Sequence, residues 1–526
     1  MKKTQHTTMP TLNWIGKEKV INHHQDVPYR ILEKQYTYAN GKETNSPPLE
    51  GLGEANKIIH GDNLEALKSL LPEYEGKIKC IYIDPPYNTG NEGWVYNDNV
   101  NHPKLKKWLG QVVGKESEDL SRHDKWLCMM YPRLKLLHKL LADDGVIFIS
   151  IDDAEYTSIR ILIDEIFGKT NFIGNICHKS RSSISNDLLI SQNHHYLLCF
   201  AKKFNEIFKA KRNFRLPQEY KGFKNPDNDP NGSYKLVPVD GPGGAAKGNP
   251  YYTFKGVTGY WRYSEETMNE LYEKGEIIVK PKSLSRKYYL TKAKQKGGAT
   301  PTTWWDDAGT ATNGTRLLKE IFNGEKVFDT PKPIEFLERV CNLGLWGDNP
   351  IILDSFAGSG TTAHAVLNLN KQDGGNRKFI LVEMEDYANT ITAKRVKRVI
   401  NGYGTGNKTV EGTSGDFTYY ELGQPLFLDN ELLNEEVGKE KIEEYVWYTE
   451  AKAPYKPKEE QYLLGSKNDT AYYFYYEKNR LTTLDESFLR TLKTKANQYM
   501  IYADLCLLDQ SLMDKYHIVF KKYQET

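Results

Sequence analysis

The feature that most constrains the fold is an alternation of short apolar strands with amphipathic helices in two separate stretches of the chain. The spacing predicts strands over 56–62, 77–84, 146–152, 194–202, 350–354 and 378–383. Helices are predicted between them over 63–74, 123–145 and 331–344. Strands that are separated by helices form βαβ units, so the sequence predicts an α/β fold on a mostly parallel sheet.

A segment rich in Gly, Pro, Tyr and Lys interrupts this alternation, and we interpret it as an inserted domain of loops and short strands. The predicted organisation is an N-terminal arm (1–55), the first part of the α/β domain (56–204), the insertion (205–325), the second part of the α/β domain (326–405) and a C-terminal α+β domain (406–526). The sheet must therefore close across the insertion.

Composition excludes several classes of protein. The six cysteines are scattered, which argues against a zinc ribbon or a disulfide framework and suits a reducing cytoplasm. We find neither an apolar run long enough to span a bilayer nor a signal peptide, so no membrane association is expected. The net charge of +2 does not by itself point to nucleic acid, although a local basic patch can still bind it.

The turn over residues 354–360, here the glycine turn, follows a predicted strand and precedes a helix. Gly358 and Gly360 let the backbone approach a ligand closely, and a carboxylate such as Glu383 at the end of the next strand is the usual partner of ribose hydroxyls. A phosphate-binding P-loop needs a lysine that is lacking here, so an NTPase is disfavoured. By itself the turn is explained equally well as a capped strand-to-helix turn.

The turn over residues 84–87, here the proline turn, is Asp84-Pro85-Pro86-Tyr87 at the end of a predicted parallel strand, where open α/β sheets bind ligands. The prolines stiffen the backbone, so a carbonyl beside the carboxylate gives two acceptors for the two hydrogens of a base amino group. Both acceptors would localise the amine lone pair for attack on an electrophilic methyl group, and Tyr87 offers a stacking face for an extruded base. Alone, the motif is more simply a surface turn.

In this order, "DPPYNTGN" and "LDSFAGSGTT" resemble the β-class of amino-methylating DNA methyltransferases, which use S-adenosylmethionine. The segments "PTLNWIGKEKVINHH", "HDKWLCMMYPRLKLLHKLLADDGVIFISIDD" and "FDTPKPIEFLERV" are similar to the modification subunits of Type III restriction–modification systems. The resemblance covers about residues 10–405. It implies a Rossmann-like methyltransferase fold with a mostly parallel seven-stranded sheet, a circularly permuted motif order and a target-recognition domain as the insertion.

The resemblance also implies roles for individual residues. Asp62 would contact the cofactor adenine, Lys332 would face its methionine part, and Asp84 rather than Ser favours adenine N6 over cytosine N4. The implied catalytic residues are Asp84, Pro85, Pro86 and Tyr87. The implied cofactor-binding residues are Asp62, Asp84, Lys332, Asp354, Phe356, Ala357, Gly358, Ser359, Gly360, Thr361 and Glu383.

The insertion carries a basic and aromatic stretch, which is typical of contact with DNA phosphates and bases. Its residues are Lys282, Arg286, Lys287, Tyr288, Tyr289, Lys292, Lys294 and Lys296. We interpret His194 and His195 as packing residues rather than metal ligands, since adjacent side chains on a strand point to opposite faces. Trp304 and Trp305 are interpreted as domain packing rather than as wedges between bases. No metal is expected.

The sequence therefore predicts a site-specific N6-adenine methyltransferase acting on double-stranded DNA with S-adenosylmethionine as cofactor. A second copy of the chain and a restriction subunit with nuclease and translocase activity are candidate partners, because the chain has no nuclease or helicase signature. The alternatives are an N4-cytosine methyltransferase, a non-catalytic DNA-specificity protein with the same fold, and an enzyme acting on RNA.

Overall fold

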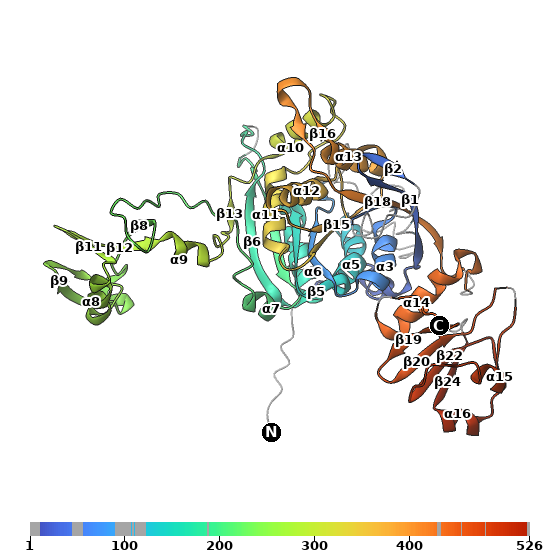
Figure 1. Ribbon diagram of the computed structural model, residues 1–526. Coiled ribbons are helices and arrows are strands. Elements are labelled where there is room, and N and C mark those ends of the chain that lie inside the picture. Colours follow the sequence, from blue (N-terminus) through green and yellow to red (C-terminus); the bar gives the residue numbers. More distant parts are fainter. Residues whose placement is uncertain are drawn as a thin grey trace. The chain divides into compact units, whose positions relative to one another are not determined.

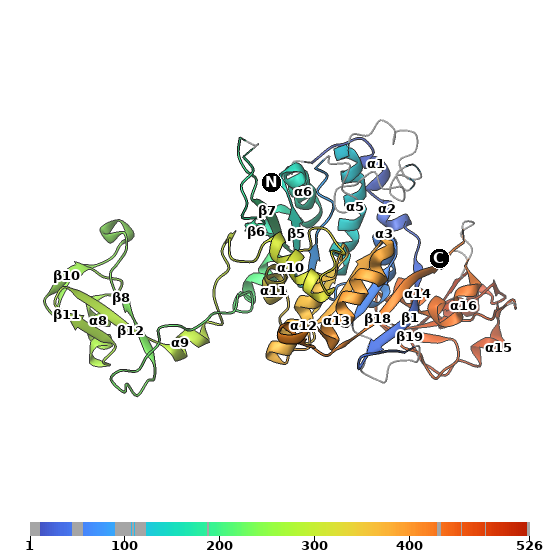
Figure 2. The same ribbon diagram turned by 90° about the horizontal axis from the view of Figure 1, so that it is seen from above.

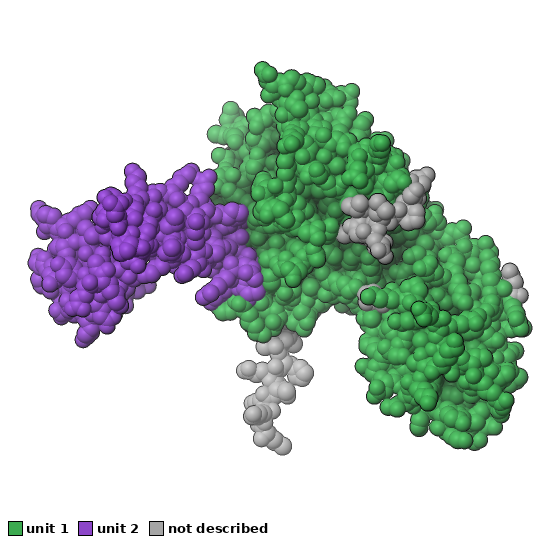
Figure 3. Space-filling view, in the orientation of Figure 1, with its two compact units in different colours: residues 1–209, 302–526 green, residues 210–301 purple. Residues whose placement is uncertain are grey.

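The computed structural model describes residues 11–44, 56–89, 107, 110, 122–186, 189–428, 433–453, 455–478 and 480–522. Residue contacts divide the chain into two compact units, the first formed by residues 1–209 and 302–526 and the second by residues 210–301 (Figure 3). Residues 302–325, which we expected in the insertion, belong to the first unit because Trp304 and Trp305 form a strand of its central sheet.

The first unit is built on an eleven-stranded sheet within the described residues (Figure 1). From edge to edge its strands are β13 (Trp304–Trp305), β6 (Phe172–Lys179), β7 (His194–Ala201), β5 (Leu141–Ile151), β4 (Ile78–Ile83), β14 (Ile351–Asp354), β15 (Lys378–Glu383), β3 (Lys57–His60), β18 (Asp416–Pro425), β1 (Arg30–Ala39) and β2 (Lys42–Thr44). The six consecutive strands from β5 to β18 are mutually parallel. The predicted α/β fold with a mostly parallel sheet is confirmed.

The sheet is longer than the seven strands that the resemblance implied. Its extra strands come from three predicted regions: β1 and β2 from the N-terminal arm, β13 from the insertion, and β18 from the C-terminal domain. β1 and β18 pair antiparallel, and the rings of Tyr36 and Tyr419 stack with centroids 5.1 Å apart. Part of the predicted arm is therefore an edge of the sheet, while residues 1–10 and 45–55 of that arm lie outside the described residues.

Helices cover both faces of the sheet (Figures 1 and 2). On one face lie α3 (Asn63–Tyr74), α5 (Arg122–Leu140) and α6 (Asp153–Phe167), with α1 (Lys17–Val20) and α2 (His23–Asp26) packed on α5. On the other lie α10 (Ala311–Ile321), α11 (Ile334–Gly344), α12 (Thr361–Asp373) and α13 (Lys394–Asn401). The three predicted helices are present, and the second ends at Leu140, where β5 begins. Among the described residues, no helix combines the length and apolarity needed to cross a bilayer.

The C-terminal region forms a second, smaller layer of helix and sheet. Its strands are β19 (Leu463–Lys467), β20 (Thr470–Phe474), β22 (Gln498–Tyr502) and β24 (Ile518–Lys521), with α14 (Lys439–Ala451), α15 (Glu486–Leu489) and α16 (Gln510–Tyr516) around them. Trp447 of α14 shares one apolar cluster with Tyr29 and Ile31, at the start of β1. This region therefore packs directly against the end of the central sheet.

The second unit has its own small core. Its strands are β8 (Tyr234–Pro238), β11 (Ile277–Lys280) and β12 (Ser283–Tyr289) in one sheet and β9 (Tyr251–Phe254) and β10 (Val257–Tyr260) in a hairpin, with α8 (Glu265–Glu273) and α9 (Leu290–Gln295). Trp261, Met268 and Leu284 are buried together in its apolar cluster. The predicted character of short strands and loops matches this unit.

Candidate active site

The proline turn and the glycine turn meet at the carboxyl edge of the central sheet. β14 lies directly beside β4, with Asp354 opposite Tyr82, so the turns after both strands start at the same edge. They line one cavity of about 30 Å³ together with the segment over 328–332. The lining residues are Tyr82, Asp84, Phe328, Thr330, Pro331, Lys332, Leu337, Asp354, Phe356, Ala357, Gly358, Ser359, Thr361 and Thr362. The structure thus brings Asp84 and the glycine turn together, as the sequence predicted.

Three polar side chains form a closed triangle at this cavity. Lys332 Nζ lies 2.5 Å from Asp84 Oδ2 and donates to the Tyr87 hydroxyl at 2.9 Å. The Tyr87 hydroxyl donates to Asp84 Oδ1 at 2.8 Å. Burial, reinforced by the Asp84 carboxylate, raises the pKa of Tyr87 well above its usual value, so the phenol keeps the proton that it donates. Asp84 is therefore held by a cation and a hydroxyl, both on side chains.

The proline turn is fixed from behind by α5. The buried indole of Trp126 donates from Nε1 to the Pro86 carbonyl at 2.6 Å. Asn88, which follows the turn with a positive φ of 57°, donates from Nδ2 to Glu155 Oε1 at 2.5 Å. The Trp126 indole thus fixes the orientation of the Pro86 carbonyl and occupies one of its two acceptor positions.

The glycine turn is shaped by two buried carboxyl groups. Glu383, at the end of β15, accepts from the Gly358 N–H at 2.7 Å and from the Glu385 N–H at 3.0 Å. Asp354 accepts from the Phe356 N–H at 3.1 Å and from the Thr362 hydroxyl at 2.5 Å. Gly358 has φ of 53°, a left-handed conformation that favours glycine.

These two carboxyl groups have raised pKa values. Burial raises the pKa of Glu383 to about 8 and that of Asp354 to about 7, although both accept hydrogen bonds that favour their charged forms. The charge of Asp354 further raises the pKa of Glu383, and that of Asp84 raises the pKa of Asp354. Near neutral pH, Glu383 and Asp354 are therefore at least partly protonated, whereas an exposed carboxyl group would be ionised.

A family model described as DNA methylase matches residues 78–394, which contain both turns and the segment between them. The chain belongs to this DNA methylase family. The resemblance stated from its motifs is thus confirmed.

Relatives of this chain include modification subunits and single-chain methyltransferases. The chain is 35% identical to the Type III restriction-modification enzyme StyLTI Mod subunit of Salmonella typhimurium over 377 aligned residues. The aligned residues make up 68% of this chain and 56% of that protein. The chain is 32% identical over 394 residues to the Type II methyltransferase M.KpnI of Klebsiella pneumoniae, covering 67% and 85%. The solved PvuII DNA methyltransferase (cytosine-N4-specific) is 14% identical over 65% of this chain and 87% of that chain, with a TM-score of 0.35. The chain thus spans little more than half of the Mod subunit that it matches.

Two of the predicted cofactor residues, Glu383 and Asp62, have structural partners of their own. Both Glu383 oxygens accept backbone hydrogen bonds, so its first task here is to hold the glycine turn. Asp62 caps α3 by accepting from the Leu64 N–H at 2.8 Å, and Arg133 Nη2 lies 3.5 Å from it. Asp62 does not line the cavity. The ribose and adenine contacts of these two residues stay predictions.

Residues that the motifs did not indicate support the site. Arg133 is buried and donates to Asn63 Oδ1, and Asn63 donates to the Ser355 carbonyl, which connects α5 to the glycine turn. Arg395 is also buried and donates to the hydroxyls of Ser359, at 2.9 Å, and Thr361, at 2.7 Å. An arginine within an otherwise apolar stretch of helix is the sequence signal that was available for Arg133, whereas Arg395 stands among other basic residues and has no such signal.

The two histidines of the sheet beside the site are neutral near pH 7. The ring of His195 packs edge-on against Tyr87, 5.1 Å between centroids, and burial followed by the charge of Lys332 lowers its pKa to about 3. Burial lowers the pKa of His178 to about 4, and its Nε2 lies 2.8 Å from the Gly309 carbonyl. In the described ranges, no group of three or more His, Cys, Asp or Glu is arranged to hold a metal.

In the second unit, half of the predicted DNA-contacting residues are engaged internally. Lys287 is buried between Asp227 and Asp229, with Nζ–Oδ distances of 2.6 and 2.7 Å, and Tyr289 is buried and donates to Asp229. Arg286 and Lys292 both pair with Glu276. Lys287 and Tyr289 are thus buried within the unit and not on its surface, whereas Lys292 is exposed and Arg286 half-buried, and their contact with DNA stays a prediction. Lys282, Lys294 and Lys296 are exposed, with Lys296 4.9 Å above the ring of the half-buried Tyr288.

Proposed function

We propose that this chain transfers a methyl group from S-adenosylmethionine to adenine N6 in a short recognition sequence of double-stranded DNA. The observation that carries the proposal is the single cavity shared by Asp84 and the glycine turn in a member of the DNA methylase family. The Type III Mod relatives support a role as the modification component of a restriction–modification system, working in the cytoplasm.

The polar groups that line the cavity fit S-adenosylmethionine. The carboxyl groups of Asp354 and Glu383 end neighbouring strands, and Phe356 offers a ring beside the backbone of Gly358. S-adenosylmethionine supplies a methyl group bonded to a positively charged sulfur. Because a cavity of about 30 Å³ has the volume of roughly one water molecule, a nucleoside enters only when the Lys332 side chain and the segment over 328–331 move aside.

Asp84 is the residue that we expect to act on the base. The Pro86 carbonyl is held by Trp126, so the Pro85 carbonyl is the one placed to accept one amino hydrogen while Asp84 accepts the other. Two acceptors pull the lone pair out of conjugation with the ring and make the amine nucleophilic. Methyl transfer leaves one proton too many on the nitrogen, and the Asp84 carboxylate is the group placed to take it. Lys332 must release Asp84 first, since it occupies Oδ2.

The remaining proposals concern partners. The members of the predicted basic stretch other than the buried Lys287 and Tyr289 are the proposed DNA contacts of the second unit, namely Lys282, Arg286, Tyr288, Lys292, Lys294 and Lys296. A restriction subunit and a second copy of the chain are proposed partners, with the C-terminal region over 406–526 as the docking or dimerisation surface. The named Type III Mod relatives support the restriction subunit.

Transfer of tritiated methyl groups to unmethylated duplex DNA tests the proposal, with Asp84→Ala as the control protein. Mass spectrometry of the digested product should give N6-methyladenine. N4-methylcytosine would reassign the base, and no transfer by the wild-type chain under any condition would support a non-catalytic DNA-specificity protein instead.

A further inference from the structure

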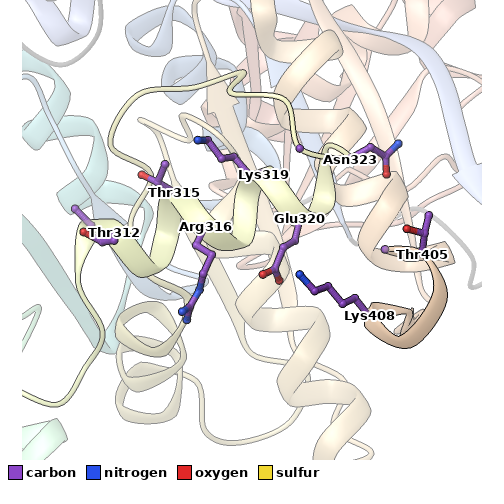
Figure 4. Close-up of a pocket in the computed structure, with 11 residues that line it drawn as sticks. Thr312, Thr315, Arg316, Lys319, Glu320, Asn323, Thr405 and Lys408 are labelled. Atoms are coloured by element: carbon purple, nitrogen blue, oxygen red, sulfur yellow. The ribbon is translucent and has the colours of Figure 1, made fainter.

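A second and much larger pocket lies along α10, apart from the catalytic cavity (Figure 4). Its volume is about 680 Å³, within the range of ligand sites in proteins. One wall is the face of α10 that carries Thr312, Arg316 and Lys319, and the other is the loop after β16 (Gly402–Tyr403), which carries Lys408. The DNA methylase motifs do not explain this pocket, because none of its residues belongs to either turn.

The pocket is positively charged, and its cations are free. Arg316, Lys319 and Lys408 are all exposed, and none of their side chains makes a hydrogen bond, ion pair or ring contact with any described part of the chain. Glu320 is the one carboxylate among the lining residues, all of which are described. Three cations against one anion give a local charge of +2, which equals the formal charge of the whole chain.

The chemistry of the lining narrows the ligand class. Arg and Lys together with Thr and Asn side chains supply donors for phosphate oxygens. No aromatic residue is among the described residues that line the pocket, so a free nucleotide would find no ring on which to stack its base. An open, cationic and non-aromatic surface is suited to a sugar–phosphate backbone whose bases are held elsewhere.

The same helix connects the pocket to the catalytic cavity. On its opposite face, Gly314 packs so closely on the segment that carries Lys332 that a Cβ there would lie 2.2 Å from the Pro331 carbonyl oxygen. Lys332 in turn contacts Asp84. A phosphate bound by Arg316 or Lys319 is therefore one helix diameter from the segment that forms the catalytic cavity, about 10 Å.

We propose that the α10 pocket, lined by Arg316, Lys319 and Lys408, binds backbone phosphates of the DNA that presents its base to Asp84. This inference rests on the proposed function and assigns it a phosphate-binding site outside the second unit. Such contacts position the duplex and carry no sequence preference of their own.

The test compares two triple variants of the full chain with the same change in charge. In the first, Arg316→Ala, Lys319→Ala and Lys408→Ala remove the pocket cations. In the control, Lys456→Ala, Lys458→Ala and Lys495→Ala remove three exposed cations from the C-terminal region that have no partner in the described chain. Fluorescence anisotropy measures duplex affinity at several salt concentrations, calorimetry measures S-adenosylmethionine affinity, and thermal melting monitors folding.

The pocket variant should bind duplex DNA about ten-fold more weakly at moderate salt, and the slope of log Kd against log salt should decrease by about one for each phosphate that is no longer bound. The reduction in affinity should be equal for cognate and unrelated sequences, with cofactor affinity unchanged. Glu320→Gln should shift affinity in the opposite direction, by about two- to three-fold. The control variant should keep the wild-type slope.

Several results overturn the inference. One is a pocket variant with wild-type affinity and slope; another is a control variant weakened as much, since net charge rather than the pocket would then be responsible. Titration of ATP tests a free nucleotide as the ligand: ATP binding that the pocket variant loses while it keeps its duplex affinity also refutes the proposal. If the wild-type chain neither binds nor methylates DNA, both the proposed function and this inference are refuted. If the pocket variant methylates DNA normally at low DNA concentration, only the assignment of the pocket is refuted.

Discussion

The proline turn and the glycine turn face the same cavity but are held in different ways. The proline turn is fixed by hydrogen bonds from side chains: Lys332 and Tyr87 donate to Asp84, and Trp126 donates to the Pro86 carbonyl. Around the glycine turn, backbone N–H groups are bound instead, by Glu383 and by the Val382 carbonyl, which accepts from the Ala357 N–H at 3.1 Å.

This difference separates a part that changes partners from a part that keeps its shape. A side chain such as Lys332 moves by rotation about its own bonds, so Asp84 can exchange its present partners for a base amino group. A backbone hydrogen bond is released only when the chain itself moves, so the glycine turn is preorganised. We therefore expect substitutions at the proline turn to affect the rate of transfer and those at the glycine turn to affect cofactor affinity.

The largest expected effect is that of Asp84→Ala. Loss of an acceptor and proton-accepting group should lower the rate of methyl transfer by about 10³-fold or more, since such groups contribute about 10² to 10⁴. Tritiated-methyl transfer measures the rate, and calorimetry should give a cofactor affinity close to that of the wild type. Transfer at the normal rate would remove Asp84 from the chemistry and with it the distinction between the turns.

Glu383→Ala should have a smaller effect, and it should act on cofactor affinity rather than on the rate of methyl transfer. The Gly358 and Glu385 N–H groups lose their acceptor, so S-adenosylmethionine affinity should fall about 10- to 100-fold, corresponding to roughly 1.4–2.8 kcal/mol for two hydrogen bonds that contribute about 0.5–1.5 kcal/mol each. Calorimetry measures this affinity, and duplex binding in the same preparation serves as the control. Unchanged cofactor affinity together with weaker DNA binding would contradict the division of roles.

The pair of Asp84 and Lys332 can be examined without any ligand. Each single variant, Asp84→Asn or Lys332→Met, leaves one partly buried group without its partner, whereas the double variant removes both. A double-mutant cycle on the free energy of unfolding should give a coupling of about 1–2 kcal/mol. A coupling near zero would mean that Lys332 does not hold Asp84 in the free protein.

The last prediction concerns the pH dependence of stability. The pKa of Glu383 in the folded protein, about 8, lies above that of an unfolded glutamate, so the folded state holds a proton that the unfolded state has lost. Its contribution to stability is complete below about pH 4.5 and decreases as pH rises through about 8, by at most about 1.4 kcal/mol per pH unit. Chemical denaturation of wild type and Glu383→Gln from pH 6 to 8 should show a flatter profile for the variant; parallel profiles would argue against a protonated Glu383.

The sequence predicted those parts of the fold that depend on local patterns. The apolar period of residues 63–74, capped by Asp62, and the runs that became β4 and β14 gave α3 and the parallel centre of the sheet. The strands outside the parallel centre that come from the arm, the insertion and the C-terminal region were missed because their pairing is remote: β18 lies between β3 and β1, with Tyr419 opposite Ile58. No local signal specifies a partner so far along the chain.

The candidate site divides in the same way. Motif and spacing indicated Asp84 and Gly358, but not that Lys332 would close the triangle, because that contact spans 248 residues. The basic stretch of the second unit was misjudged for the same reason. A lysine count cannot tell that Lys287 would be buried between two aspartates, or that Arg316 would remain unpaired.

The point at which the chain leaves and re-enters the central sheet has a consequence for inheritance. It departs after β7 and returns at β13, and these two strands flank β6 at one margin of the sheet. No strand of that sheet falls within residues 210–301. A recombination event that grafts a foreign segment between these junctions would leave every strand pairing of the central sheet intact, so a lineage can exchange that segment in one step while the two turns at the carboxyl edge are inherited unaltered.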